Sequence, residues 1–137
     1  IVRIGTYTGG VTANIISCFI INSIGRGLFI YDQSTVLIDG CLISNNTLEG
    51  ILVESDDVNQ TSDLVINNST IKNNSGVGID CNRTNLTINN STISNNSEFN
   101  ENDQYEHAAG IYWDFASSQS GALLLNNINI IRMRKMI

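Results

Sequence analysis

Short runs in which apolar and polar residues alternate recur along the chain. The segments 35–46, 63–74 and 85–96 align without gaps and share the template apolar-x-Ile-x-x-small-x-Ile-x-Asn-Asn. Alternation with a period of two places every second side chain on one face of a β-strand, whereas a helix needs longer stretches with a period of about 3.6 residues. The pattern therefore predicts short β-strands throughout the chain.

Weaker copies of this template lie around residues 16–22 and 123–130. From Ile16 to Leu125, the residues equivalent to the first template Ile are spaced by 22, 28, 22 and 37 positions. A fixed period with occasional insertions is typical of a solenoid in which each repeat packs on its neighbours. A glycine with an apolar residue after it follows each of the first four copies of the template. These glycines are Gly27, Gly50, Gly78 and Gly110.

The repeats predict an all-β protein, a single-stranded parallel β-helix of about five coils of about 22 residues each, with loop insertions. Each coil has three strands, and equivalent residues of successive coils stack into columns inside the solenoid. Each buried aliphatic side chain contributes roughly 1.5–3 kcal/mol, so these columns form a stable core without a cofactor. The expected columns are Ile16, Ile38, Ile66, Ile88 and Leu125; Ile21, Ile43, Ile71, Ile93 and Ile130; and Leu28, Ile51, Ile79 and Ile111.

The asparagines are expected to lie at the corners of the coils. Asparagine tolerates the left-handed backbone that tight corners need. Its side-chain amide can also bond to the equivalent amide one coil above and below, which forms a ladder. The expected ladders are Asn46, Asn74 and Asn96 in one corner, and Asn68, Asn90 and Asn127 in another.

The 137 residues are expected to form one β-helix domain. Residues 1–10 are irregular or form a partial coil, residues 11–131 form the repeat coils, and residues 132–137 form a tail. Because no amphipathic capping helix is recognisable at either end, we expect this domain to be part of a longer protein. No apolar stretch is long enough to span a membrane.

The net charge and the cysteines bear on which ligands and partners the chain is expected to have. The net charge is −6, and nucleic-acid binding needs clustered Lys and Arg, so a nucleic-acid partner is not expected. The three cysteines show no CxxC spacing, and we expect Cys41 and Cys81 to pack as small buried hydrophobic residues. No metal ligand set and no cofactor are predicted.

The sequence Leu-x-Ile-x-x-Ser-x-Ile-x-Asn-Asn followed by Gly-Ile, at 64–79, resembles the repeat of the pectate-lyase-like right-handed parallel β-helix superfamily. The resemblance runs from about Val11 to Ile131. It implies a right-handed solenoid and a secreted or cell-surface setting. Members include polysaccharide lyases and hydrolases, epimerases, phage tailspikes and adhesin-like surface proteins.

The Asn-rich and Ile-rich repeats are most similar to those of the adhesin-like group. Phe19-Ile-Ile-Asn22 and the Ala-Gly-Ile-Tyr sequence at 109–112 are similar to the FxxN and GGA-I/L repeats of polymorphic surface proteins, although Ala109 replaces one glycine. No motif specific to the enzymes of the superfamily is present, so the resemblance assigns no catalytic residue to this chain.

The strand after each recurring glycine carries the candidate chemistry on its solvent face. Asp80 and Asp114 lie on successive copies of this strand. Stacked strands are about 5 Å apart, which suits a retaining glycosidase pair. His107, the only histidine, lies in the long insertion and is a candidate general base or metal ligand. The alternative is that these groups are solvated surface residues.

Tyr112 on the same solvent face could offer a stacking platform for a sugar ring. Glu54 and Arg83 are further candidates for ligand binding, whereas the alternation places Trp113 in the core. A loop bracketed by Asp56 and Asp63 is rich in oxygen ligands that calcium prefers. Its spacing does not match a known calcium loop, so calcium binding stays only a possibility.

Two functions remain open from the sequence. The first is an extracellular or cell-surface β-helix that acts as an adhesin-like binding surface or scaffold, with its specificity in the loops and with polysaccharide or host glycan as the expected partner. The second is a carbohydrate-active β-helix of the polysaccharide lyase or glycoside hydrolase type, which uses a groove beside the Gly-Ile strand. We favour the first because no complete set of catalytic groups can be assembled from the sequence.

Overall fold

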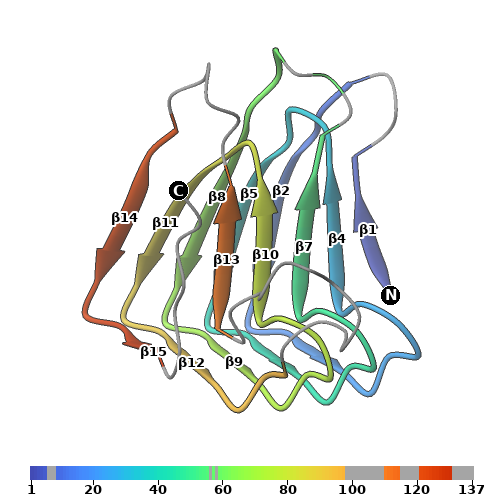
Figure 1. The fold of residues 1–137 in the computed structure, drawn as a ribbon, viewed down its shortest axis with the longest axis vertical. Helices are drawn as coiled ribbons and strands as arrows, with labels where there is room; N and C mark the ends of the chain where they lie inside the picture. The colour runs from blue at the N-terminus through green and yellow to red at the C-terminus, as the bar shows by residue number, and fades with distance from the viewer. Residues whose placement is uncertain (6–8, 56, 58, 98–109, 115–120, 131–137) are drawn as a thin grey trace.

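The computed structural model describes residues 1–5, 9–55, 57, 59–97, 110–114 and 121–130. These residues form fifteen strands and no helix, arranged in three parallel sheets of five strands each (Figure 1). Sheet 1 consists of β1 (Val2–Ile4), β4 (Leu28–Tyr31), β7 (Ile51–Glu54), β10 (Ile79–Asn82) and β13 (Ile111–Asp114). Sheet 2 consists of β2 (Thr12–Ile16), β5 (Thr35–Asp39), β8 (Ser62–Asn67), β11 (Thr84–Asn89) and β14 (Leu123–Asn126). Sheet 3 consists of β3 (Phe19–Ile21), β6 (Leu42–Ser44), β9 (Thr70–Lys72), β12 (Thr92–Ser94) and β15 (Asn129–Ile130).

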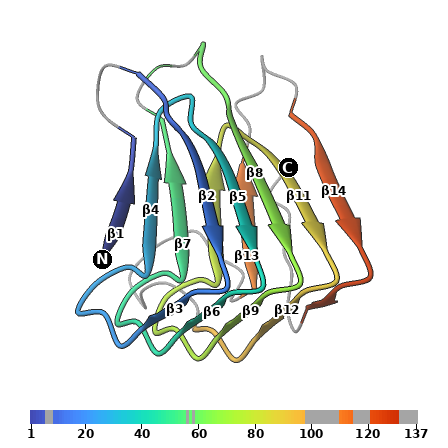
Figure 2. The same cartoon turned by 180° about the vertical axis from the view of Figure 1, so that it is seen from behind.

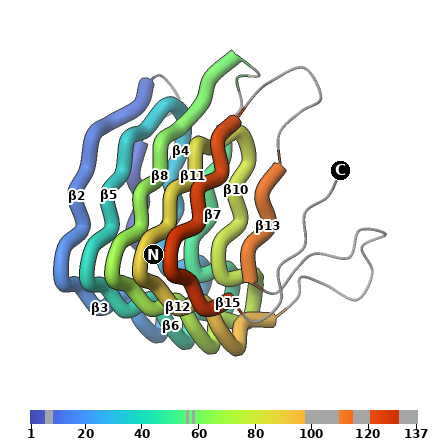
Figure 3. Tube along the Cα trace, turned by 90° about the vertical axis from the view of Figure 1, so that its left-hand side faces the viewer, coloured from blue at the N-terminus to red at the C-terminus, as the bar shows by residue number. Residues whose placement is uncertain are grey.

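Every sheet takes one strand in three from the chain, so the chain winds around a common axis as a solenoid. Figure 2 shows the molecule turned by 180°, with sheet 2 towards the viewer, and Figure 3 shows the coils following one another as a stacked tube. All of the strand pairs are parallel. Five strands in each sheet agree with the predicted number of coils. Strand β1 lies in the segment that was expected to be irregular or a partial coil, and the tail at 132–137 lies outside the described residues.

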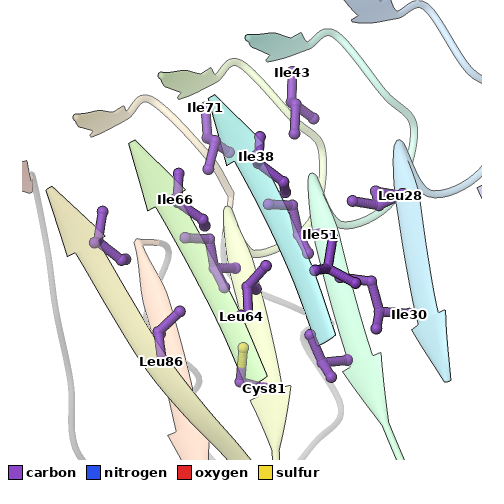
Figure 4. Close-up of a cluster of buried hydrophobic side chains, with 14 of the residues drawn as sticks. Leu28, Ile30, Ile38, Ile43, Ile51, Leu64, Ile66, Ile71, Cys81 and Leu86 are labelled. Atoms are coloured by element: carbon purple, nitrogen blue, oxygen red, sulfur yellow. The ribbon is translucent and has the colours of Figure 1, made fainter. Parts of the chain in front are cut away.

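The inward side chains of the three sheets form one hydrophobic core (Figure 4). Ile38, Ile66 and Ile88 lie in register in sheet 2 and are fully buried. The expected third column, in sheet 1, is also confirmed, and its members Leu28, Ile51, Ile79 and Ile111 are fully buried. The alternation in the sequence therefore identified the buried face of each strand from the second coil onward.

The first coil is shifted by one residue from the prediction. Ile15, not Ile16, pairs with Ile38 in sheet 2. In sheet 3 it is likewise the Ile20 side chain, rather than Ile21, that stacks on the core, and Ile16 and Ile21 are 55% and 43% exposed. Both positions are Ile-Ile pairs, so the sequence allowed either residue to face inward. A slip of one residue reverses the face of a whole strand, and packing on the second coil selects the observed register.

The two residues of each Asn-Asn pair have different roles. Asn45, Asn73 and Asn95 have φ angles of 56°, 55° and 53°, so the first asparagine of the pair makes the left-handed corner and its side chain is exposed. The second asparagine turns inward and is buried. A single corner thus uses the two properties of asparagine in two successive residues: tolerance of the left-handed backbone and the ability to bond as a ladder.

The expected buried ladder is confirmed. Asn46 donates from Nδ2 to Oδ1 of Asn74 at 2.8 Å, and Asn74 donates to Oδ1 of Asn96 at 2.9 Å. Each Oδ1 also accepts the backbone N–H of the preceding coil, including that of Ser23 at 3.0 Å. The second Nδ2 hydrogen of each amide bonds to the carbonyl oxygen of an isoleucine in the core strand. The buried amides are therefore satisfied by the repeat itself.

The second expected ladder is exposed and only partly continuous. Asn127 donates to Oδ1 of Asn90 at 2.9 Å, whereas Asn68 donates to Asp39 at 2.8 Å. These asparagines have φ angles near 49°, so here the corner residue is itself the ladder residue. The sequence reasoning missed a neighbouring ladder in sheet 2, formed by Asn67, Asn89 and Asn126 with two bonds of 2.8 Å.

Candidate functional site

The outer face of sheet 1 carries the candidate chemistry. The strand register places side chains of different character beside one another on successive coils. The first outer row consists of Arg3, Phe29, Leu52, Asp80 and Tyr112. The second outer row includes two pairs of adjacent residues, Tyr31 with Glu54 and Asn82 with Asp114. Among the described residues, this is the only outer face that combines aromatic and carboxylate side chains.

The other two sheets have simpler outer faces. In sheet 2, one outer row repeats as Asp39, Asn67, Asn89 and Asn126, and these residues bond to one another or to corner asparagines. In sheet 3, Thr70 and Thr92 occupy equivalent outer positions. Rows that repeat the same chemistry are explained by coil stacking alone. The outer rows of sheet 1 change from coil to coil, as does the sheet 2 row of Leu37, Val65, Thr87 and Leu124, and only the sheet 1 rows bring aromatic and carboxylate groups together.

Asp80 and Asp114 lie on this face but do not face each other directly. Asp80 pairs in register with Tyr112, and Asp114 pairs with Asn82. The two residues are on adjacent strands but two positions apart along the strand direction. Their Cα atoms are therefore separated by about 8 Å rather than the expected 5 Å. Both side chains are half-buried. The structure therefore gives a diagonal carboxylate pair, with Tyr112 beside the first carboxylate.

The remaining candidates fall in different places. His107 lies outside the described residues. Glu54 is exposed at the end of β7. Trp113 points inward as predicted, packs against the core, and donates from Nε1 to the carbonyl oxygen of Thr84 at 2.8 Å. Tyr112 is consequently the only aromatic residue on the outer face of β13.

Arg83 positions a loop rather than reaching outward. It has a φ angle of 49° and occupies the corner after β10, where its guanidinium donates from Nη1 to the carbonyl oxygen of Ser55 at 2.7 Å. Ser55 in turn donates its hydroxyl to Oδ1 of Asp32 at 3.0 Å, and both of these residues are buried. These contacts tie the start of the 55–61 insertion to the corners of two neighbouring coils.

Two arginines gather around one ring at the β1 end of sheet 1, which the sequence reasoning did not anticipate. The Cζ atoms of Arg3 and Arg26 each lie 5.5 Å from the ring centroid of Phe29. Arg3 also lies 5.7 Å from the ring of Tyr31, and Arg26 forms an ion pair with Glu49 at 2.9 Å. Tyr31 is only 3% exposed although its register is outward. Sheet 1 therefore has a basic and aromatic end opposite the acidic residues on β10 and β13.

Cys41 and Cys81 are buried as small core residues, whereas Cys18 is exposed. Cys81 is fully buried, and burial raises the pKa of its thiol well above the ordinary value of 9.0. The negative charge of Asp80 raises this pKa further, while a hydrogen bond with Thr84 opposes the shift. The thiol is thus held in its neutral form, which is a poor nucleophile.

Cys41 occupies a polar column in the corner between sheets 2 and 3. Its backbone N–H donates to Oγ of Ser69 at 3.0 Å, and the N–H of Ser69 donates to Oγ of Ser91 at 3.1 Å. Cys18 continues the column, since its N–H donates to Sγ of Cys41 at 3.4 Å. The prediction that Cys41 is buried as a small residue is confirmed.

The oxygen-rich loop that suggested calcium is bonded internally. Asn59 donates from its backbone N and from Nδ2 to Oδ1 of Asp57, and Asp63 accepts from Asn85 at 2.8 Å. Asp56 lies outside the described residues. Within the part of the chain that the structure describes, no cluster of three or more His, Cys, Asp or Glu side chains could hold a metal ion. The same part contains no helix long and apolar enough to cross a membrane.

The fold and the stacked asparagines define the class of this protein as a parallel β-solenoid. The model of the family described as right-handed β-helix region matches residues 4–130, and the chain belongs to this family. The winding is therefore right-handed, as the resemblance implied. Neither the search of curated proteins nor the search of solved structures finds a match.

Proposed function

We propose that this chain is a non-catalytic binding segment of a secreted or cell-surface protein and that it uses the outer face of sheet 1 to hold a glycan. The observation that carries the proposal is that, among the described residues, this outer face alone combines aromatic and carboxylate side chains. The inward columns, the ladders and the outer row of sheet 2 that begins at Asp39 are repetitive and serve coil stacking. The outer rows of sheet 1 change from coil to coil, as expected of a surface shaped by a ligand.

The position of the insertions supports the same face. The 55–61 insertion leaves sheet 1 after β7, and the segments 98–109 and 115–120 precede and follow β13 in the chain. Loops next to a rigid scaffold commonly carry binding specificity. The strip formed by Asp80, Tyr112, Asn82 and Asp114 offers an aromatic ring with polar groups around it, which suits the apolar faces and hydroxyl groups of a sugar.

The test is a panel of polysaccharides and glycans measured against the folded protein by biolayer interferometry. Tyr112→Ala is expected to weaken the binding of a glycan that the wild type recognises by about three- to tenfold, because a stacking ring is lost. Asp114→Asn is expected to weaken it as well. Circular dichroism should show the same β-rich spectrum for each variant.

Matched controls come from the other faces. Phe19→Ala removes an exposed aromatic ring from the outer face of sheet 3, and Asp63→Asn removes an exposed carboxylate from sheet 2. Neither change should alter glycan binding. If folded wild-type protein binds no glycan on the panel, or if the controls lose binding equally, the proposed role of this face is wrong.

A carbohydrate-active enzyme is the second candidate, favoured by the diagonal placement of Asp80 and Asp114. Carboxyl groups about 6.5–9.5 Å apart suit an inverting hydrolysis, in which one acts as the acid and the other activates water. The Cα atoms of the two residues, about 8 Å apart by strand geometry, allow the side chains to place their carboxyl groups within that range. Digestion of the same panel, followed by new reducing ends and unsaturated uronate absorbance, distinguishes the two functions. Product that disappears in Asp80→Asn or Asp114→Asn would establish the enzyme and overturn the first proposal.

A further inference from the structure

Cys18 and Cys41 occupy equivalent positions in adjacent coils of the solenoid. The strand register is the same before the corner, between β2 and β5, and after it, between β3 and β6, so Cys18 lies opposite Cys41. The backbones are bonded on both sides of the pair. The N–H of Ser17 donates to the carbonyl oxygen of Asp39 at 2.8 Å, and the N–H of Leu42 donates to that of Cys18 at 2.9 Å. The two cysteine backbones are therefore held one strand spacing apart, about 4.8 Å.

The column that contains these cysteines directs each side chain at the backbone of the preceding coil. Oγ of Ser91 accepts the N–H of Ser69, and Oγ of Ser69 accepts the N–H of Cys41. In the same way, Sγ of Cys41 accepts the N–H of Cys18 at 3.4 Å. The sulfur of Cys41 thus lies against the backbone of Cys18, and rotation about χ1 of Cys18 turns the second sulfur towards it.

This spacing suits a disulfide bond, and the third cysteine has no thiol beside it. Bridged cysteines usually have Cα atoms about 4.4–6.8 Å apart. Cys81 lies in sheet 1, where its neighbours on the adjacent strands are Val53 and Trp113. The described residues include all three cysteines of the chain, each as a free thiol. Among them, Cys18 and Cys41 are the only two at neighbouring positions of one column.

We propose that Cys18 and Cys41 form a disulfide bond when the protein meets a small-molecule disulfide as oxidant, as extracellular proteins do. One cysteine attacks the oxidant as its thiolate, and the other then displaces the small thiol from the mixed disulfide. One sulfur–sulfur bond forms in the protein, two S–H bonds are lost, and the oxidant is reduced to two thiols. The bond closes β3, β4 and β5, one complete turn of the solenoid, into a covalent ring that resists unwinding. It does not depend on glycan binding.

The test is oxidation of the folded protein by oxidised glutathione, blocking of the remaining thiols in urea, and trypsin digestion without reduction. Cleavage after lysine and arginine places the three cysteines on separate peptides, 4–26, 27–72 and 73–83. Mass spectrometry is expected to find peptide 4–26 linked to peptide 27–72, with a blocked thiol on peptide 73–83. Glutathione that stays attached to Cys18 or Cys41 in place of this link, or covalent dimers of the chain, would overturn the proposal.

Matched variants separate the bond from other effects of losing a cysteine. Cys41→Ser supplies the side chain that Ser69 and Ser91 already provide in this column, so it should fold without forming the bond. Cys81→Ala should form the bond as the wild type does. Reduction of the oxidised wild type should lower its melting temperature by about 5–15 °C, whereas Cys41→Ser treated in the same way should not change. Equal responses of these two proteins would overturn the proposal.

The role of the column is tested by moving the pair to the next coil. In Cys18→Ser combined with Ser69→Cys, the thiols take positions 41 and 69, which have the same relationship in the column. Oxidation should link Cys41 to the new cysteine, observed as the loss of two hydrogen atoms within peptide 27–72. A folded double variant that forms no such link would overturn the inference that the column brings the two sulfurs together.

Discussion

Gly50 packs directly against the side-chain amide of Asn74 on the next coil. A Cβ atom at position 50 would lie 2.8 Å from Nδ2 of Asn74 and 2.6 Å from the carbonyl oxygen of Gly78. The same relationship joins Gly27 to Asn46, where the corresponding distance is 2.7 Å. The glycine that recurs after each template is therefore required by the close approach of the asparagine ladder to the backbone of sheet 1.

We expect Gly50→Ala to lower the free energy of unfolding by about 3 kcal/mol, since the methyl group would overlap a backbone oxygen that cannot move without displacing a strand. Urea denaturation followed by circular dichroism measures this loss. Gly9→Ala is the matched control, because no atom lies within 4 Å of a Cβ atom at position 9. It should change stability by less than about 0.5 kcal/mol. Equal stability of Gly50→Ala and the control would contradict the close packing.

Asn74→Ala should also destabilise the protein by about 3 kcal/mol. The Oδ1 atom of Asn74 accepts both the backbone N–H and the Nδ2 of Asn46, and its removal leaves two buried donors without a partner. Each unsatisfied buried donor costs roughly 1–3 kcal/mol. Denaturant titration measures the change, with Thr92→Ala on the outer face of β12 as the control. A loss as small as that of the control would show that the ladder adds little to stability.

Asn73, the residue before Asn74, should tolerate replacement by glycine with little loss of stability. Asn73 is exposed and has a φ angle of 55°, a conformation that glycine adopts freely and that a β-branched residue adopts only at a cost. Asn73→Gly should change the free energy of unfolding by only a few tenths of a kcal/mol, whereas Asn73→Val should lower it by about 1–2 kcal/mol. Thermal or denaturant unfolding of the two variants side by side makes the comparison. The interpretation fails if valine is tolerated as well as glycine.

The buried thiol of Cys81 predicts a loss of stability in alkaline solution. Its pKa in the folded protein is raised above the ordinary value of 9.0, mainly by burial, so above that pH the unfolded chain releases a proton that the folded chain retains. Stability from this group is complete below pH 9.0 and falls as the pH rises from there towards the raised pKa, by at most about 1.4 kcal/mol per pH unit.

Urea titrations at about pH 8 and pH 10 of the wild type and of Cys81→Ala measure this contribution. The difference in stability between the two proteins should become smaller at the higher pH, because alanine has no proton to lose. All other residues are the same in both proteins, so their contributions cancel in the comparison. A difference that is the same at both pH values would show that Cys81 does not titrate differently on unfolding.

The repeats of the sequence were sufficient for most of the fold. The period-two pattern of Leu64 and Ile66 identifies the inward face of their strand without knowledge of the strands beside it, because successive side chains of a strand point to opposite faces. The buried asparagine column and the glycine column follow from the same spacing. The predicted register of the first coil was wrong by one residue in sheets 2 and 3, because the doublets Ile15-Ile16 and Ile20-Ile21 satisfy the pattern in two registers.

The candidate site was predicted less completely. The sequence placed Asp80, Tyr112 and Asp114 on one outer face, and the structure agrees. The expected distance of about 5 Å was wrong, because Asp80 follows Gly78 by two residues and Asp114 follows Gly110 by four, so the two carboxylates differ in position along the strand. The sequence also did not show that Arg83 binds the backbone of Ser55, because that contact depends on the path of an insertion outside the repeat.

By itself, the sequence determined the solenoid, its period and the residues that fill it, because each coil repeats the same local pattern and packs only on its neighbours. Only the tertiary structure decided which chemical groups meet on the outer face of sheet 1. Arg3, for example, reaches the ring of Phe29 through pairing between strands more than twenty residues apart in the chain. Outer side chains are not held by the repeat, so their neighbours are fixed only when the coils have stacked.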